Sequence, residues 1–124
     1  MNSNLLRLAL IAMTVGAIHN ARAGSAVAME RLHGNLATAY GGPVEREKAR
    51  ALNNARRLYG NDVKIIAATD VTGYGAIAIA RWRDRFLVGV ALGMRSATEA
   101  DTVAINKCLR AGGTNPQIKW AFHG

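Results

Sequence analysis

Residues 81–85, Arg-Trp-Arg-Asp-Arg, combine three arginines with a tryptophan in one short segment. An arginine side chain presents a planar fork of N–H donors that fits carboxylate and phosphate groups, and it stacks on aromatic rings. Tryptophan and arginine are also the residue types that most often dominate the energetics of protein interfaces. Arg81, Trp82, Arg83 and Arg85 are therefore the candidate binding site, with an anionic partner. The alternative interpretation is a solvated, charged turn with Trp82 tucked into the core.

Residues that could carry enzyme chemistry are few. Beyond residue 23 the histidines are His33, in a segment that predicts a turn, and His123, beside the last residue of the sequence. Glu99 and Asp101 are explained by the favourable interaction of acids with a helix start. No spacing of cysteine and histidine suggests zinc, and the glycines at 73 and 75 precede a strand-like segment rather than the helix that a dinucleotide site needs. The sequence therefore predicts a non-enzymatic protein with no metal and no cofactor.

The first 23 residues have the layout of a cleavable export signal. Arg7 precedes an apolar run from Leu8 to Ile18, and residues 21–23, Ala-Arg-Ala, form a cleavage site. The run is too short for a membrane helix, which needs about 20 apolar residues. We expect a signal peptide over residues 1–23 and one mature domain over residues 24–124, periplasmic or secreted and without stable membrane insertion. The alternative is an amphipathic first helix that stays in the fold.

The mature part keeps a basic excess. Removing Arg7 and Arg22 from the 16 basic side chains leaves fourteen against 8 acidic ones, a net charge of about +6. An exported basic protein meets anionic sugars, lipid headgroups and acidic proteins before it meets nucleic acid. We therefore expect a protein partner or an anionic envelope component, and no nucleic acid.

Cys108 is the one cysteine of the chain, so no internal disulfide can form. Stability must therefore come from packing. Two interpretations stay open for the thiol: a small buried hydrophobe, or a group that pairs with another chain.

The chain repeats one order of elements twice, over residues 24–70 and 74–124. Apolar or β-branched stretches predict strands and capped, charged stretches predict helices. The strands are expected at residues 26–29, 36–40, 63–69, 76–82, 86–92 and 117–122, and the helices at 43–59 and 97–110.

Residue matches support this internal repeat. Residues 51–57 align with 104–110, and residues 26–29 align with 76–79. The pair 63–64 also finds a match at 118–119. The pattern predicts an α+β fold: two pseudo-symmetric strand-strand-helix-strand units forming a mainly antiparallel six-stranded sheet with two helices packed on it.

Each expected helix carries a stripe of small or apolar residues on one side, which lets its axis approach a sheet closely. The stripes are Val44, Ala51, Leu52, Ala55 and Leu58, and Ala97, Ala100, Ala104, Ile105 and Cys108. Ser96 followed by Glu99 forms a capping box at the start of the second helix.

The central hairpin, residues 76–92, is apolar on both alternating faces. A half-exposed antiparallel strand would alternate apolar with polar residues. The second face must therefore be covered, either by another sheet layer of this chain or by a partner subunit, as in a homodimer. The sequence leaves both options open.

The second unit resembles a known family over about the last 50 residues. The residues that carry the resemblance are the Gly-Ala-Ile-Ala opening at 75–78, Gly93, the helix start from Ser96 to Ala100, Cys108, and the Ile-Lys-Trp-Ala-Phe strand at 118–122. They are similar to the domain-of-unknown-function family four-one-eight-nine, whose members are small exported bacterial proteins. Members usually carry a second cysteine before the final strand, where this chain has residues 114–117, Thr-Asn-Pro-Gln. The resemblance implies export and supplies no catalytic residues.

Three functional hypotheses follow. The first is a binding or inhibitory module of the bacterial envelope, such as an immunity protein that blocks an envelope-directed toxin. The second is a secreted effector that binds anionic host or envelope surfaces through its basic charge. The third is a weak hydrolase that uses His33 or Asp84.

Overall fold

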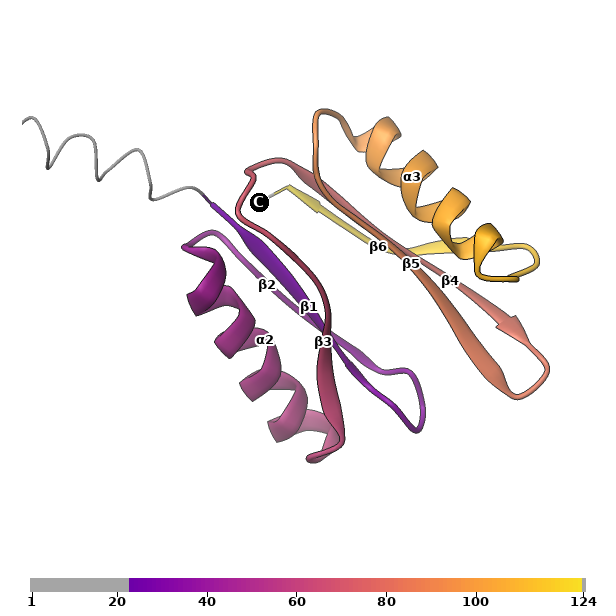
Figure 1. Ribbon diagram of the computed structural model, residues 1–124, viewed down its shortest axis with the longest axis horizontal. Coiled ribbons are helices and arrows are strands. Elements are labelled where there is room, and N and C mark those ends of the chain that lie inside the picture. The colour runs from indigo at the N-terminus through magenta and orange to yellow at the C-terminus, as the bar shows by residue number, and fades with distance from the viewer. Residues whose placement is uncertain (1–22, 124) are drawn as a thin grey trace, which may run out of the picture.

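The computed structural model describes residues 23–123, which Figure 1 shows as a coloured ribbon. The expected signal peptide, residues 1–23, lies outside the described residues except for Ala23. Among the helices in the described range, none has both the length and the apolar character needed to cross a membrane.

Two strand-strand-helix-strand units follow one another along the chain. The elements are β1 (Ser25–Glu30), β2 (Leu36–Tyr40), α2 (Val44–Tyr59) and β3 (Val63–Thr69), then β4 (Tyr74–Trp82), β5 (Arg85–Met94), α3 (Ala97–Arg110) and β6 (Gln117–His123). This order confirms the expected α+β fold with two repeated units. The bounds of β2, β3 and α3 are those expected from the sequence.

The start of α3 shows how local chemistry sets an element boundary. The Ser96 hydroxyl accepts a hydrogen bond from the N–H of Glu99 at 3.1 Å, which satisfies one of the donors that a helix start leaves unpaired. The Glu99 carboxylate accepts from the N–H of Arg95 at 3.4 Å, one residue before the position that an ideal capping box uses.

Each unit closes its own antiparallel sheet, with strand orders β2-β1-β3 and β5-β4-β6. The expectation of one six-stranded sheet is therefore wrong, because the strands form two three-stranded sheets. The central strand of each sheet pairs on one side with its hairpin partner and on the other with the strand that follows the helix. The sheets meet through their faces rather than by joining their edges.

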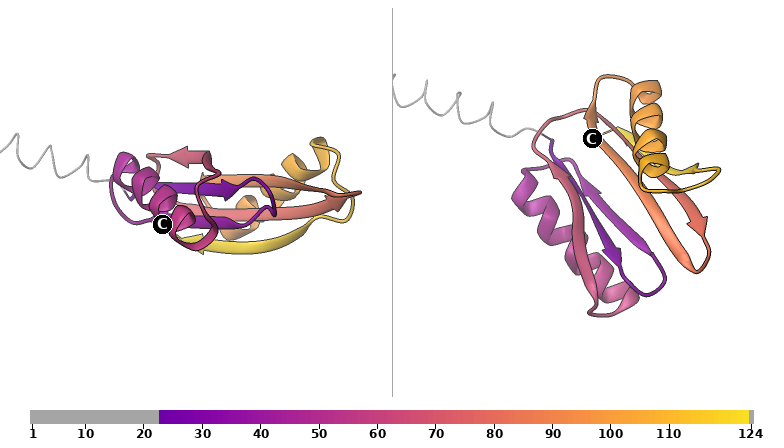
Figure 2. Two further views of the ribbon diagram at one scale, coloured as in Figure 1. Left: turned by 90° about the horizontal axis from the view of Figure 1, so that it is seen from below. Right: turned by 45° about the vertical axis from the view of Figure 1, so that its right-hand side comes forward.

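The two sheets stack with α2 and α3 on the outer sides, as the three views in Figures 1 and 2 show. Val27 in β1 and Ile77 in β4 are fully buried on the inner faces of the two sheets. The alanines that alternate with them along each strand lie on the outer faces, toward the helices. Tyr40 at the end of β2 stacks on Phe122 in β6, with ring centroids 4.8 Å apart. The second face of the central hairpin is thus covered by another layer of the same chain, the first of the two options.

Small side chains form the contact between each helix and its sheet. Ala51 and Ala55 in α2, and Ala104 and Cys108 in α3, are fully buried, which confirms the centre of each expected stripe. Leu58 is 59% exposed, so its assignment to the stripe is wrong. Ala97, the other exposed stripe residue, also lies in a terminal helical turn, whereas the central turns make the sheet contact.

Glu47 completes the buried stripe of α2, one turn before Ala51. Its carboxylate accepts hydrogen bonds from the N–H of Gly42 at 2.7 Å and from the guanidinium of Arg50 at 2.8 Å. These hydrogen bonds compensate the buried Glu47 carboxylate for the contacts with water that it loses on burial. Sequence reasoning missed this residue, because an acid in the first helical turn is normally explained by the helix dipole.

The repeat extends to an irregularity in the sheets. A β-bulge lies between Val27 and Ala28 in the first unit and between Ile77 and Ala78 in the second. Because bulges are position-specific features, their agreement supports the alignment of residues 26–29 with 76–79.

The strand registers correct one part of the sequence alignment. Ala28 pairs with Ile65, and its counterpart Ala78 pairs with Ile118, so Ile65 corresponds to Ile118. The match of residues 63–64 with 118–119 is therefore two residues out of register. A two-residue slip preserves the alternation of faces, so the apolar pattern alone does not reveal it.

Candidate functional site

The candidate residues lie at the end of the β4–β5 hairpin. Trp82 pairs with Arg85, which leaves Arg83 and Asp84 as a two-residue turn, as expected from the sequence. Arg83 has a φ of 57°, in the left-handed region. Positive φ at this turn position matches the right-handed twist of the flanking strands. The turn places residues 81–86 at the surface, where all six are exposed.

Alternation along the strands divides the four candidate residues between the two faces of the hairpin. Arg81 pairs with Phe86, and these two side chains share one face. Trp82 and Arg85 pair on the opposite face. The four residues therefore surround the hairpin end rather than forming one flat cluster.

Two of the arginines stack on aromatic rings. The guanidinium carbon of Arg81 lies 4.9 Å from the ring centroid of Phe86, and that of Arg83 lies 4.5 Å from Trp82. Trp82 is 42% exposed, so the alternative with its side chain tucked into the core is wrong. Cation–π contact orients a guanidinium while its N–H edge stays available to an anion.

The end of the β1–β2 hairpin packs against this site. A Cβ built on Gly34 would lie 2.9 Å from the Phe86 ring, so the ring rests directly on the glycine backbone. Beside it Leu32 is 79% exposed. Arg31 forms an ion pair with Asp62 at 3.2 Å, which ties the hairpin end to the loop before β3.

Glu30 holds the turn of the first hairpin together. Its buried carboxylate accepts hydrogen bonds from the N–H of His33 at 2.8 Å and from the side-chain amide of Asn35 at 3.0 Å. Burial raises the pKa of Glu30, but the backbone N–H groups of His33 and Leu32 and the Asn35 amide outweigh burial, so the pKa is lowered. The carboxylate is therefore ionised at neutral pH.

His33 lies beside a carboxylate, as a hydrolase would require, with 3.5 Å between its Nδ1 and Oε1 of Glu30. That carboxylate is already engaged by the turn, and Asp84 lines a different hollow. In the described part of the chain, no group of three or more His, Cys, Asp or Glu residues could hold a metal ion. The arrangement thus serves the turn and gives the hydrolase hypothesis no specific support.

A pocket of about 470 Å³ lies between the two hairpin ends. Its apolar lining includes Ile79 and Phe86, and its basic lining includes His33, Arg81 and Lys119. We refer to this pocket and the turn beside it as the basic hairpin end, which comprises Leu32, His33, Arg81, Trp82, Arg83, Arg85, Phe86 and Lys119. The sequence did not single out three of these residues: Phe86 adjoins the segment but lies outside its run of arginines, Lys119 reaches the turn through the pairing of β6 with β4, and Leu32 comes from the other sheet.

Cys108 is fully buried and free, between α3 and the β4–β5 hairpin. Its thiol donates a hydrogen bond to the carbonyl of Leu87 at 3.3 Å, and burial raises its pKa. These observations favour the interpretation of Cys108 as a small core residue.

Comparisons of the chain with protein families, with curated proteins and with solved structures give no match. The resemblance to domain-of-unknown-function family four-one-eight-nine stays a prediction.

Proposed function

We propose that this chain is an exported bacterial binding protein that holds an acidic partner protein at the basic hairpin end. The observation that carries the proposal is the pair of stacked arginines, Arg81 on Phe86 and Arg83 on Trp82, at an exposed hairpin end. An inhibitory role, such as that of an immunity protein against an envelope-directed toxin, is the form of this function that we favour.

The chemistry of the hairpin end suits an acidic protein surface. Exposed tryptophan and arginine are the side chains that most often dominate interface energetics. The pocket lined by Arg81 and Lys119, with a volume of about 470 Å³, has room for a carboxylate side chain, and Arg81 can donate to it through a forked pair of N–H groups. Basic residues on both hairpins would also speed association with an acidic partner.

Copurification tests the proposal. The full chain with a C-terminal tag is expressed in a bacterial host that exports it, and envelope and culture fractions are passed over the tag resin. We expect one acidic protein to be retained by the wild-type chain and lost from the variant with Arg81→Ala and Arg83→Ala. The control carries Arg46→Ala and Arg95→Ala, which lie beyond the ends of β2 and β5 that are opposite the hairpin turns. Equal retention by all three chains, or retention of nothing, would count against the proposal.

A second candidate, binding to an anionic lipid surface, rests on one observation. Leu32, the most exposed large apolar side chain described, lies at the same end as the arginines, and apolar side chains flanked by basic ones favour an anionic membrane surface. Sedimentation with anionic vesicles separates the candidates. Adsorption through charge should fall steeply as salt rises, whereas a packed protein interface should persist.

A further inference from the structure

The two edges of the space between the sheets are related by the internal repeat, yet they are filled differently. At one edge β2 meets β6, where Tyr40 stacks on Phe122. At the other edge β3 meets β5. The internal repeat relates these two edges, because β2 of the first unit corresponds to β5 of the second, and β3 corresponds to β6.

One pair of equivalent residues shows the difference. Trp120 in β6 pairs with Ile77 at the bulge of the second unit, and Ala67 in β3 pairs with Val27 at the bulge of the first. A methyl group therefore occupies the position that an indole occupies at the opposite edge. The missing side-chain volume leaves space between β3 and β5.

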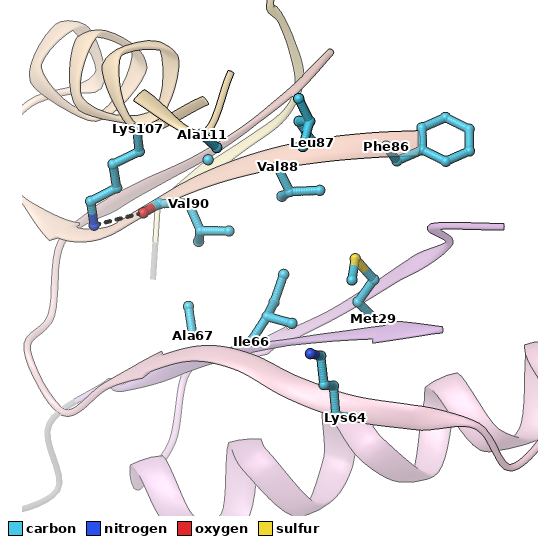
Figure 3. Close-up of a pocket in the computed structure, with 11 residues that line it drawn as sticks. Met29, Lys64, Ile66, Ala67, Phe86, Leu87, Val88, Val90, Lys107 and Ala111 are labelled. Atoms are coloured by element: carbon cyan, nitrogen blue, oxygen red, sulfur yellow. Dashed lines mark hydrogen bonds between the residues drawn. The ribbon is translucent and has the colours of Figure 1, made fainter. Parts of the chain in front are cut away.

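A cavity of about 440 Å³ occupies that space, within the range of about 300–1,000 Å³ typical of small-molecule sites. Figure 3 shows aliphatic side chains from both sheets facing one another across it. Met29 and Ile66 come from the first sheet, and Val88 and Val90 come from the second.

The charged groups of the cavity are all of one sign. Of the 11 lining residues, two are lysines and none is acidic. Lys107 reaches over from α3 and donates to the carbonyl of Val90 at 3.0 Å, and Lys64 lies on the opposite wall, on β3 (Figure 3). Two ammonium groups beside an aliphatic interior complement a molecule with an alkyl chain and a single anionic head.

We propose that this cavity binds a long-chain carboxylate, with its alkyl chain between β3 and β5 and its head beside Lys64 or Lys107. The cavity shares Phe86 with the basic hairpin end, but its other lining residues lie outside that site, and the proposal does not depend on the function assigned there.

Dodecanoate is the probe for the first test. Backbone amide signals of the ¹⁵N-labelled chain are followed by NMR while dodecanoate is added below its micelle-forming concentration. We expect saturable shifts centred on Ala67, Val88 and Val90, and much weaker binding of dodecyltrimethylammonium, which carries the same chain with a positive head. Shifts scattered over the surface, or equal binding of the two amphiphiles, would overturn the proposal.

Two matched substitutions test the cavity itself. Ala67→Trp copies the side chain found at the equivalent position, Trp120, and should fill the space and weaken dodecanoate binding at least about tenfold. The control is Ala68→Trp, because the neighbouring alanine is exposed and points to the opposite face of β3. Unchanged affinity in a folded Ala67→Trp chain would contradict the proposed location.

Lysine variants keep the proposal testable if Ala67→Trp does not fold. Lys64→Met and Lys107→Met together should weaken dodecanoate binding roughly tenfold, because each removes one charge near the head group. Lys48→Met on α2, outside the cavity, should leave the affinity unchanged. Equal affinities for the double variant and this control would overturn the assignment of the head group.

Discussion

Gly89 in β5 lies directly against the backbone of Ala104 in α3. A Cβ built on Gly89 would lie 2.1 Å from the Ala104 carbonyl oxygen and 2.5 Å from the amide nitrogen of Cys108. Gly89 pairs with Ala78, and the counterpart of Ala78 in the first unit, Ala28, pairs with Ala37. Ala37 is therefore the counterpart of Gly89, and the first sheet accommodates its methyl group beneath α2. The close approach of α3 to its sheet therefore depends on the absence of a side chain at Gly89.

Gly89→Ala should destabilise the fold by overpacking, by roughly 1–3 kcal/mol. Urea unfolding followed by circular dichroism measures the change. The matched control is Ala37→Gly, which should cost only about 0.5–1 kcal/mol, the usual cost of glycine within a strand. A Gly89→Ala chain as stable as the wild type would show that α3 does not approach the sheet so closely.

The Cys108 thiol should make stability depend on alkaline pH. Its pKa is raised by burial, so the unfolded chain loses this proton at a lower pH than the folded chain does. The resulting stabilisation is complete below the pKa of the unfolded thiol and is lost as pH rises through the folded value. Between pH 7 and pH 10 the free energy of unfolding of the wild type should therefore fall more than that of Cys108→Ala. Equal slopes would contradict the raised pKa.

Glu30 should give the opposite dependence at acidic pH. Burial alone would raise its pKa, but hydrogen bonds from His33, Leu32 and Asn35 lower it, so the ionised form stabilises the fold above the unfolded pKa. This stabilisation is lost as pH falls through the folded pKa. Glu30→Gln should be less stable than the wild type at pH 7, and the gap in urea midpoints should narrow as pH falls below about 4. A constant gap would show that the carboxylate charge does not hold the turn.

Export should remove the first 23 residues. Intact-mass analysis and N-terminal sequencing of protein recovered from the periplasm or medium should give a chain that begins at Gly24. Replacing Ala21 and Ala23 with bulky leucines should leave the precursor uncleaved. A secreted chain that still carries Met1 would contradict the signal-peptide assignment.

Local chemistry made much of the fold predictable. The β-branched run at 63–69 and the capped helix at 97–110 have the expected bounds, because strand propensity and capping act within a few residues. Because residues 76–92 are apolar on both faces of the hairpin, the sequence indicated that the second face is covered. It did not show that the cover is the other sheet, because alternation reports burial and not the identity of the neighbour.

The candidate site was predictable only in part. The composition of segment 81–85 identified it from the sequence, whereas Leu32 and Lys119 join the site through contacts between distant segments. The cavity between β3 and β5 depends on the difference in size between Ala67 and Trp120. Only the strand registers show that these two residues occupy equivalent positions. Tertiary register of this kind is not encoded in local pattern.

The affinity of the partner recovered with the chain, measured for arginine variants, tests the central claim most directly. The double variant Arg83→Ala with Arg85→Ala should weaken binding at least about tenfold and reduce its dependence on salt, because the proposed interface includes both side chains. The control pair Arg46→Ala with Arg95→Ala, which removes the same charge from the opposite end of the hairpin strands, should bind like the wild type. Equal affinity and salt dependence for the two double variants would contradict binding at the basic hairpin end.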